Sequence, residues 1–114
     1  MGVGVDIVKV ERFEKIATGQ SPRFLTRVYT EKEQAYLKGK PAQSYAGIFA
    51  AKEAVAKAMG TGFSGFWPSA IEILHDSKGK PYVSLTGYSI EISISHTATD
   101  AIAFAVTTEQ QRLP

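Results

Sequence analysis

Cysteine is absent from this chain of 114 residues, which excludes disulfide bonds and metal sites built from thiolates. No apolar run approaches the roughly 18 residues of a membrane-spanning helix, so we expect no membrane segment. The N-terminal MGVGVDIV lacks a basic region ahead of an apolar core, so we expect no secretory signal. Because a protein without cysteine suits a reducing compartment, we expect a cytoplasmic location.

The chain also has little excess charge and no P-loop motif. The formal net charge is only +2, which does not by itself indicate a nucleic-acid partner. G-x-x-x-x-G-K-[ST] does not occur, which excludes a common P-loop. The one G-x-G-x-x-G match, residues 60–65, follows a predicted helix and not a strand, so it does not have the strand–turn–helix setting of a dinucleotide site. The function must therefore be sought in other groups of residues.

Hydrophobic periodicity places one strand first, helices next and four strands last. The helices are expected over residues 9–18, 23–28, 30–38 and 42–59, and Thr30 with Glu33 forms a capping box. The turn at residues 76–80 joins a hairpin, in which Pro81 must begin the second strand. Alternating isoleucines mark the fourth strand, and residues 101–107 form the last. We therefore predict a single α+β domain, residues 1–114, with a mainly antiparallel sheet and one long helix.

The stretch FAAKEAVAKAMGTG, residues 49–62, draws attention within that long helix. Helical spacing predicts an apolar stripe that includes Ile48 and Val55, with Ala50, Glu53 and Lys57 on the opposite, small-residue side. Glycines end the helix and leave room for a ligand. By spacing alone, Glu53 and Lys57 are an ordinary exposed helix pair worth about 0.3–0.5 kcal/mol.

A second carboxylate, Asp6, lies in the first strand and points away from Val5 and Ile7. It is either a solvated strand residue or local cap, or a metal ligand that needs a partner carboxylate. The loop with Phe63, Phe66 and Trp67 is a satellite core cluster or a protein contact surface.

These residues carry a resemblance. FAAKEAVAKAMGTG, GVDIV at residues 4–8 and DSKGKPYV at residues 76–83 resemble the holo-acyl-carrier-protein synthases, the small bacterial 4'-phosphopantetheinyl transferases. The similarity runs from Gly2 to about Val106. It implies the 4'-phosphopantetheinyl transferase fold and Mg²⁺-dependent transfer of phosphopantetheine from coenzyme A to a serine of apo-acyl-carrier protein. The products would be holo-carrier protein and adenosine 3',5'-bisphosphate. The reaction would support fatty acid biosynthesis.

The resemblance also implies roles for single residues. Asp6 and Glu53 match the Mg²⁺ ligands, and Glu53 or a water beside it is the expected base. Lys57 matches a lysine that contacts the pyrophosphate, while the positions near the nucleotide of coenzyme A are Gly60, Pro81, His96 and Thr97. Lys52 reads as a snorkelling or interface lysine as much as a ligand. On its own, His96 reads as a hydrogen-bonded structural residue, and His75 has no assigned role.

One position departs from the family. Where many members carry an arginine before F-A-A-K-E-A, this chain has Ile48, and Lys40 is the candidate to replace it at the ribose phosphate.

The resemblance also bears on partners. Arg12, Arg23 and Arg27, with Lys9 and Lys15, read either as a solvated face or as a docking surface for the acidic carrier protein. A homotrimer with sites between subunits is implied, with Asp6 and Glu53 from one chain and His96 and Thr97 from the next. The alternative is a non-enzymatic basic module that binds RNA or an acidic protein. The predicted strands lack the interleaved aromatic and basic residues that stack bases, so we expect no nucleic acid.

Overall fold

The structure is a computed structural model that describes residues 1–60 and 68–109. Its order is β1 (Gly2–Lys9), a 3₁₀ turn η1 (Val10–Phe13), α1 (Glu14–Ala17), α2 (Pro22–Val28), α3 (Glu31–Leu37) and α4 (Ala42–Ala58), followed by η2 (Pro68–Ala70), β2 (Ile73–His75), β3 (Pro81–Val83), β4 (Tyr88–His96) and β5 (Asp100–Glu109). The predicted α+β class and the strand–helices–strands order are confirmed. The predicted loop with Phe63, Phe66 and Trp67 lies outside the described residues, as do Thr61 and Gly62.

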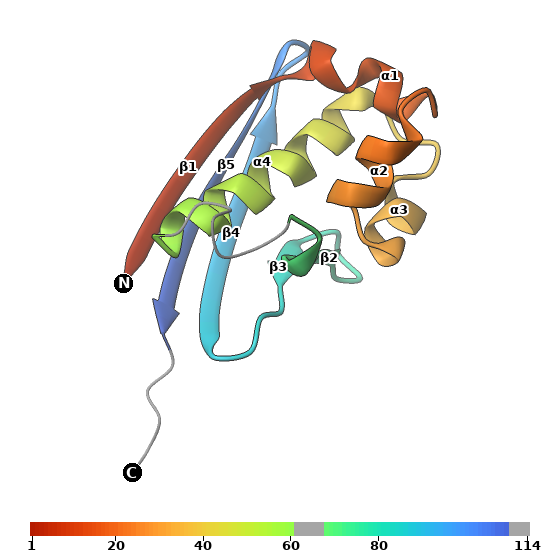
Figure 1. The fold of residues 1–114 in the computed structure, drawn as a ribbon. Helices are drawn as coiled ribbons and strands as arrows, with labels where there is room; N and C mark the ends of the chain where they lie inside the picture. Colours follow the sequence, from red (N-terminus) through yellow and green to blue (C-terminus); the bar gives the residue numbers. More distant parts are fainter. Residues whose placement is uncertain (61–67, 110–114) are drawn as a thin grey trace.

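Two antiparallel sheets replace the one expected. β5 lies between β1 and β4 in a three-stranded sheet, and β2 pairs only with β3. α4 crosses one face of the larger sheet, and the short helices gather at one end of it (Figure 1). The hairpin lies beside β4, against which β3 packs. In the part of the chain that the structure describes, no helix has the length and apolarity needed to cross a membrane.

The predicted helix over residues 9–18 is a 3₁₀ turn followed by one α-helical turn. Val10 and Phe13 are buried there, and three-residue spacing suits the tighter 3₁₀ geometry. The capping box of α3 is confirmed: Thr30 Oγ1 accepts from the Glu33 amide, and the Glu33 carboxylate accepts from the Thr30 amide.

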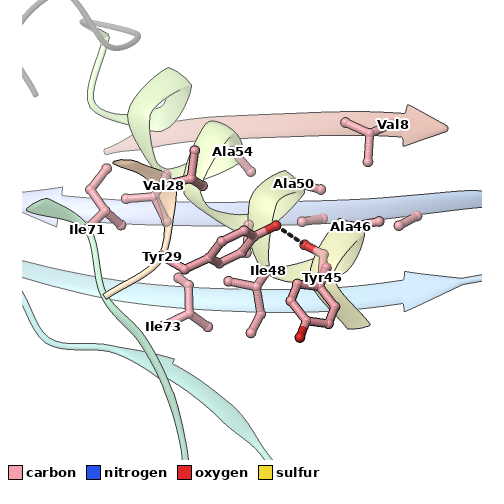
Figure 2. Close-up of a cluster of buried hydrophobic side chains, with 14 of the residues drawn as sticks. Val8, Val28, Tyr29, Tyr45, Ala46, Ile48, Ala50, Ala54, Ile71 and Ile73 are labelled. Atoms are coloured by element: carbon pink, nitrogen blue, oxygen red, sulfur yellow. Dashed lines mark hydrogen bonds between the residues drawn. The ribbon is translucent and has the colours of Figure 1, made fainter. Parts of the chain in front are cut away.

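The small-residue side expected around Ala50, Glu53 and Lys57 is not open at Ala50, which is fully buried, although Lys57 is exposed and Glu53 is partly buried. Ala54 is fully buried as well. α4 packs chiefly on β1 and β5. A Cβ on Gly4 would lie 2.0 Å from the Ala54 carbonyl oxygen, and one on Gly2 would lie 1.7 Å from that of Ala58. The alanines therefore serve close contact between helix and strand backbones, and Figure 2 shows Ala50 and Ala54 within the core.

The core lies between α4, the larger sheet and the short helices. Tyr29 is almost wholly buried, and its hydroxyl donates to the Tyr45 carbonyl oxygen at 2.7 Å (Figure 2). Ile71 and Ile73, which precede and begin β2, are also buried and fix that segment to the body.

The other face of the larger sheet is apolar and exposed. Val5 pairs with Phe104, and Ile7 pairs with Ile102. The exposed fractions of the apolar side chains on this face are 58% for Val3, 50% for Val5, 64% for Ile7, 41% for Ile102 and 43% for Phe104. We call the face defined by those five residues the outer sheet face.

Candidate functional site

Two carboxylates lie on β1 and α4, which pack against each other. Asp6 lies on the β1 face that packs on α4, as expected, and only 15% of its side chain is exposed. Burial, and after it the charge of Asp6, raise the pKa of Glu53. Lys57 and Arg12 oppose that shift with their charges.

Lys57 joins the two elements. Its Nζ donates to Asp6 Oδ1 at 3.0 Å and to the Val5 carbonyl oxygen at 3.1 Å. Because the Lys57 side chain is half exposed, the ion pair contributes little to stability but holds the ammonium beside the carboxylates. We call Asp6, Glu53 and Lys57 the carboxylate cluster.

The carboxylate cluster suits a hard divalent cation. Asp6 Oδ2 is buried and has no hydrogen-bond partner within the described part of the chain, which is costly for a carboxylate oxygen unless a ligand covers it. Among residues 1–60 and 68–109 no group of three or more His, Cys, Asp or Glu side chains could hold a metal. Mg²⁺ typically takes one or two protein carboxylates together with waters and substrate phosphate, so two suffice for it.

A cavity of about 290 Å³ lies on the other side of α4. Its walls come from α3, α4, the hairpin and β4, and are formed by Tyr36, Gln43, Ser44, Gly47, Ile48, His75, Gly79, Pro81, Ile94 and His96. Two of the residues predicted to lie near the nucleotide, Pro81 on β3 and His96 on β4, thus line the same cavity although their strands belong to different sheets. We call this space the β4 cavity.

Thr97 lies next to His96, but its hydroxyl accepts from the amides of Thr99 and Asp100 at 3.2 and 3.1 Å. In this chain Thr97 therefore shapes the turn between β4 and β5. Gly60 has φ +78 just past the C-terminal end of α4, as expected for a helix exit, and lies far along α4 from the Gln43–Ile48 wall of the β4 cavity.

Tyr36 and His75, which also line this cavity, were not among the residues predicted from the sequence. Their rings stack at 3.8 Å with an angle of 8° between planes. Lys40 Nζ lies 4.6 Å from the centre of the Tyr36 ring. Burial, and after it the charge of Lys40, lower the pKa of His75. Ile48 also lines the β4 cavity, and Lys40 lies over Tyr36, another of its lining residues.

The basic residues divide between two hollows. Arg12 and Lys15 line one of about 510 Å³, together with Glu11, Glu14 and Phe24, so its charge is mixed. Arg23 and Arg27 line another, of about 410 Å³, on α2. The Arg12 guanidinium lies 5.6 and 5.5 Å from the ring centres of Phe13 and Phe49, and Lys9 pairs with Asp100 at 3.1 Å.

Lys52 does not snorkel and does not reach a surface. Its side chain is fully buried, and its Nζ lies 2.7 Å from Glu33 Oε1. The local sequence around Lys52 does not predict this pairing, because Glu33 lies on another helix, α3.

Comparison with known proteins agrees with this geometry. The model of the 4'-phosphopantetheinyl transferase superfamily matches residues 2–109. A curated holo-[acyl-carrier-protein] synthase from Clostridium botulinum (strain Alaska E43) is 48% identical, with 92% of this chain and 94% of the relative covered. One from Alkaliphilus metalliredigens is 42% identical, with 94% and 98% covered.

Solved structures share the fold. The holo-(acyl-carrier-protein) synthase of Bacillus anthracis, in complex with CoA (3',5'-ADP), has a TM-score of 0.84 and 36% identity over 96% of both chains. That of Helicobacter pylori, in complex with coenzyme A, has a TM-score of 0.84 and 34% identity over 93% of this chain and 99% of that one. The chain therefore belongs to the 4'-phosphopantetheinyl transferase superfamily, among its holo-[acyl-carrier-protein] synthases.

Proposed function

We propose that this chain transfers the phosphopantetheine arm of coenzyme A to a serine hydroxyl of an apo-acyl-carrier protein in a Mg²⁺-dependent reaction. The transfer itself follows from the family; the metal, the products and the residue roles are the finer part of the proposal. The products are holo-carrier protein and adenosine 3',5'-bisphosphate, and the reaction serves fatty acid biosynthesis in the cytoplasm. The observation that carries the proposal is the buried, unpartnered Asp6 Oδ2 beside Glu53.

Asp6 and Glu53 are the residues that would hold the metal. Bound Mg²⁺ would supply positive charge to the pyrophosphate of coenzyme A. Glu53 accepts the proton of the carrier serine, directly or through a water, and its raised pKa brings it nearer to the pH at which a base is effective. Lys57, held by Asp6 and the Val5 carbonyl, stabilises negative charge on the transferred group.

The β4 cavity is the proposed place of the nucleotide. Pro81 and His96 line it, and Lys40 at the Tyr36–His75 pair supplies the cation for the ribose phosphate in place of the arginine absent at Ile48. Thr97 and Gly60 are proposed as further contacts of coenzyme A, each through backbone shape rather than a free side chain. Support for this assignment comes from the aromatic and histidine lining of the cavity.

Carrier-protein docking is proposed for the face that bears Arg12, Arg23 and Arg27. Arg12 is placed well for this task, because its charge acts on Glu53 while its guanidinium lies against the exposed side of the Phe13 and Phe49 cluster. A carrier protein held there would present its serine close to the carboxylate cluster.

We also propose a homotrimer whose sites lie between subunits. Burial of the outer sheet face against another copy would remove its apolar surface from water. At about 100° per residue, Glu53 and Lys57 project from α4 on the side opposite Ser44 and Ile48. One chain therefore cannot bring its own carboxylate cluster and its own β4 cavity to the same coenzyme A, whereas two neighbouring chains in a closed ring can.

A labelling assay tests the activity. Purified chain, radiolabelled coenzyme A and apo-carrier protein should give labelled carrier protein with Mg²⁺, and none with excess EDTA. A carrier protein whose acceptor serine is replaced by alanine is the control. Labelling that persists without divalent cations would contradict the metal assignment. No labelling under any condition, combined with tight RNA binding, would favour the non-enzymatic alternative.

Mixed oligomers test the shared site. Asp6→Asn and His96→Ala should each be inactive alone and should regain activity when they are unfolded together and refolded as a mixture. Some interfaces would then pair an intact carboxylate cluster with an intact β4 cavity. Mixed trimers, verified by sedimentation, that stay as inactive as either parent would contradict the shared site. A fully active monomer would contradict the assembly itself.

A further inference from the structure

A buried ion pair ties together four segments that are distant in the sequence. Lys52 Nζ contacts Glu33 Oε1 at 2.7 Å and donates to the carbonyl oxygens of Pro68 and Ile71 at 2.9 and 2.7 Å. Glu33 also accepts from the Thr30 amide through Oε1 and from the Ile73 amide through Oε2, at 2.8 and 2.7 Å. The network therefore links α3, α4, η2 and the start of β2.

The network is complete. An ammonium group has three N–H donors, and all three of the Lys52 donors have an acceptor. Both carboxylate oxygens of Glu33 are used as well. Burial lowers the pKa of Lys52, while the charge of Glu33 and its hydrogen bond oppose that shift. Because Lys52 is fully buried with no donor to spare, it cannot hold a ligand or a partner protein without leaving this network.

Stability is a weak explanation for such a pair. The cost of removing two charges from water largely cancels their attraction, and apolar residues of similar volume are often as stable. What an ion pair of this kind adds is a fixed relative position of the segments that it joins. The hairpin depends on such fixed contacts, because β2 and β3 pair only with each other and a two-stranded hairpin by itself is only marginally stable.

The parts that the network holds are the walls of the β4 cavity. On α3, Tyr36 follows Glu33 by one helical turn, so the two share a face. On β2, His75 lies two residues after the Ile73 amide that Glu33 binds, so it shares the face of Ile73. Tyr36 and His75 then stack on each other at 3.8 Å. One carboxylate thus anchors both elements that carry the stacked pair.

We propose that Glu33 and Lys52 are positioning residues that set the distance of the α3 and hairpin walls from α4, and so tune the affinity of the β4 cavity for the nucleotide end of coenzyme A. The inference rests on the proposed function of that cavity. Lys52 and Glu53 are adjacent in the chain and point about 100° apart around α4. Glu53 serves the reacting group, and Lys52 serves the binding of the nucleotide.

The test separates affinity from chemistry. Glu33→Gln/Lys52→Met removes both charges but keeps similar shapes and one acceptor for the Ile73 amide. We expect its Kd for adenosine 3',5'-bisphosphate, measured by calorimetry, and its KM for coenzyme A to rise about 10- to 100-fold. The kcat at saturating coenzyme A should stay within about 2-fold of wild type, because the carboxylate cluster is untouched.

The matched control is Glu31→Gln/Lys32→Met, which removes the same two charges from exposed positions of α3 and should leave both constants unchanged. If the buried double variant does not fold, Lys52→Arg decides: it keeps the charge, alters the reach, and should still raise the nucleotide Kd with kcat retained.

The proposal is overturned if the folded double variant binds the nucleotide with the wild-type Kd. It is also overturned if the double variant is unfolded and Lys52→Arg binds the nucleotide with the wild-type Kd. A loss of kcat without a change in Kd would overturn it as well. If the wild-type protein itself binds neither coenzyme A nor adenosine 3',5'-bisphosphate, the proposed function fails instead, and the calorimetry shows this before any variant is compared.

Discussion

The two sides of α4 are built by different means. Towards β1, backbone meets backbone, because Gly2 and Gly4 let the strand approach the carbonyl groups of Ala58 and Ala54 with no side chain between them. Towards β4 and the hairpin, side chains fill the space, and the Glu33–Lys52 ion pair sets the spacing. The first side carries the carboxylate cluster, and the second carries the β4 cavity.

The difference matches what each side has to do. Transfer of a phosphoryl-type group depends mainly on exact placement of charge, and a backbone contact between two regular elements is a rigid frame for it. Recognition of a nucleotide can be tuned by side chains and by a tethered hairpin. We therefore expect substitutions on the β1 side to act on kcat or on folding, and those on the β4 side to act on affinity.

The largest expected effect is on catalysis. Glu53→Gln should lower kcat about 10²- to 10⁴-fold, because it removes the proposed base and weakens a metal ligand together. Circular dichroism and thermal unfolding should stay close to wild type, since Glu53 is only partly buried. Glu31→Gln, at an exposed position of α3, is the matched control. A kcat near that of wild type in the Glu53 variant would refute the assignment.

Next in size is a pair of glycine variants that compares the two sides directly. Gly4→Ala would place its Cβ 2.0 Å from a backbone oxygen that cannot move alone, and we expect a loss of about 3 kcal/mol or more in the free energy of unfolding. In Gly47→Ala the new Cβ would lie 3.0 Å from the Ile94 Cγ2 methyl, a side-chain atom that can shift.

For Gly47→Ala, the gain of up to about 1 kcal/mol in helix propensity should offset much of that contact. The smaller β4 cavity should show as a higher KM for coenzyme A. Urea unfolding and steady-state kinetics measure both effects. Equal losses of stability in the two variants would show that the sides of α4 do not differ in rigidity.

The smallest effect concerns the docking face. Arg12→Glu should raise the KM for carrier protein about 10-fold or more at low salt, while the Kd for coenzyme A stays within about 2-fold. The difference from wild type should shrink as salt screens the charges. Arg27→Glu, on α2 and away from the Phe13–Phe49 cluster, should act in the same direction with kcat intact. Kinetics of the wild-type enzyme that do not change with salt would contradict a charged docking face.

Local patterns predicted the regular elements well. Alternation gave β1, β4 and β5, and the Thr30–Glu33 capping box gave the start of α3, because these signals depend on neighbours in the chain. The carboxylate cluster was reached only through the family resemblance, since Asp6 and Glu53 lie on different elements.

Tertiary contacts account for what was missed. The apolar stripe on α4 is buried as predicted, but the stripe alone could not show that Ala50, on the opposite side, is buried too, because the glycines of β1 bring a second surface onto the helix. The snorkelling role predicted for Lys52 is wrong because its ammonium pairs with Glu33 on another helix. The sequence around Glu33 indicates only its part in the capping box. Tyr36 and His75 could not be paired from the sequence, because their stacking depends on where α3 and the hairpin dock.

The double use of the Glu33 carboxylate bears on the order in which the protein folds. Its bond to the Thr30 amide spans three residues and can form as soon as α3 does, whereas its bond to the Ile73 amide spans 40. Local contacts close sooner than distant ones because less chain entropy is lost. We therefore expect the capping bond to hold the Glu33 carboxylate in one rotamer before the hairpin docks. When docking buries the Ile73 amide, its acceptor is then already in position.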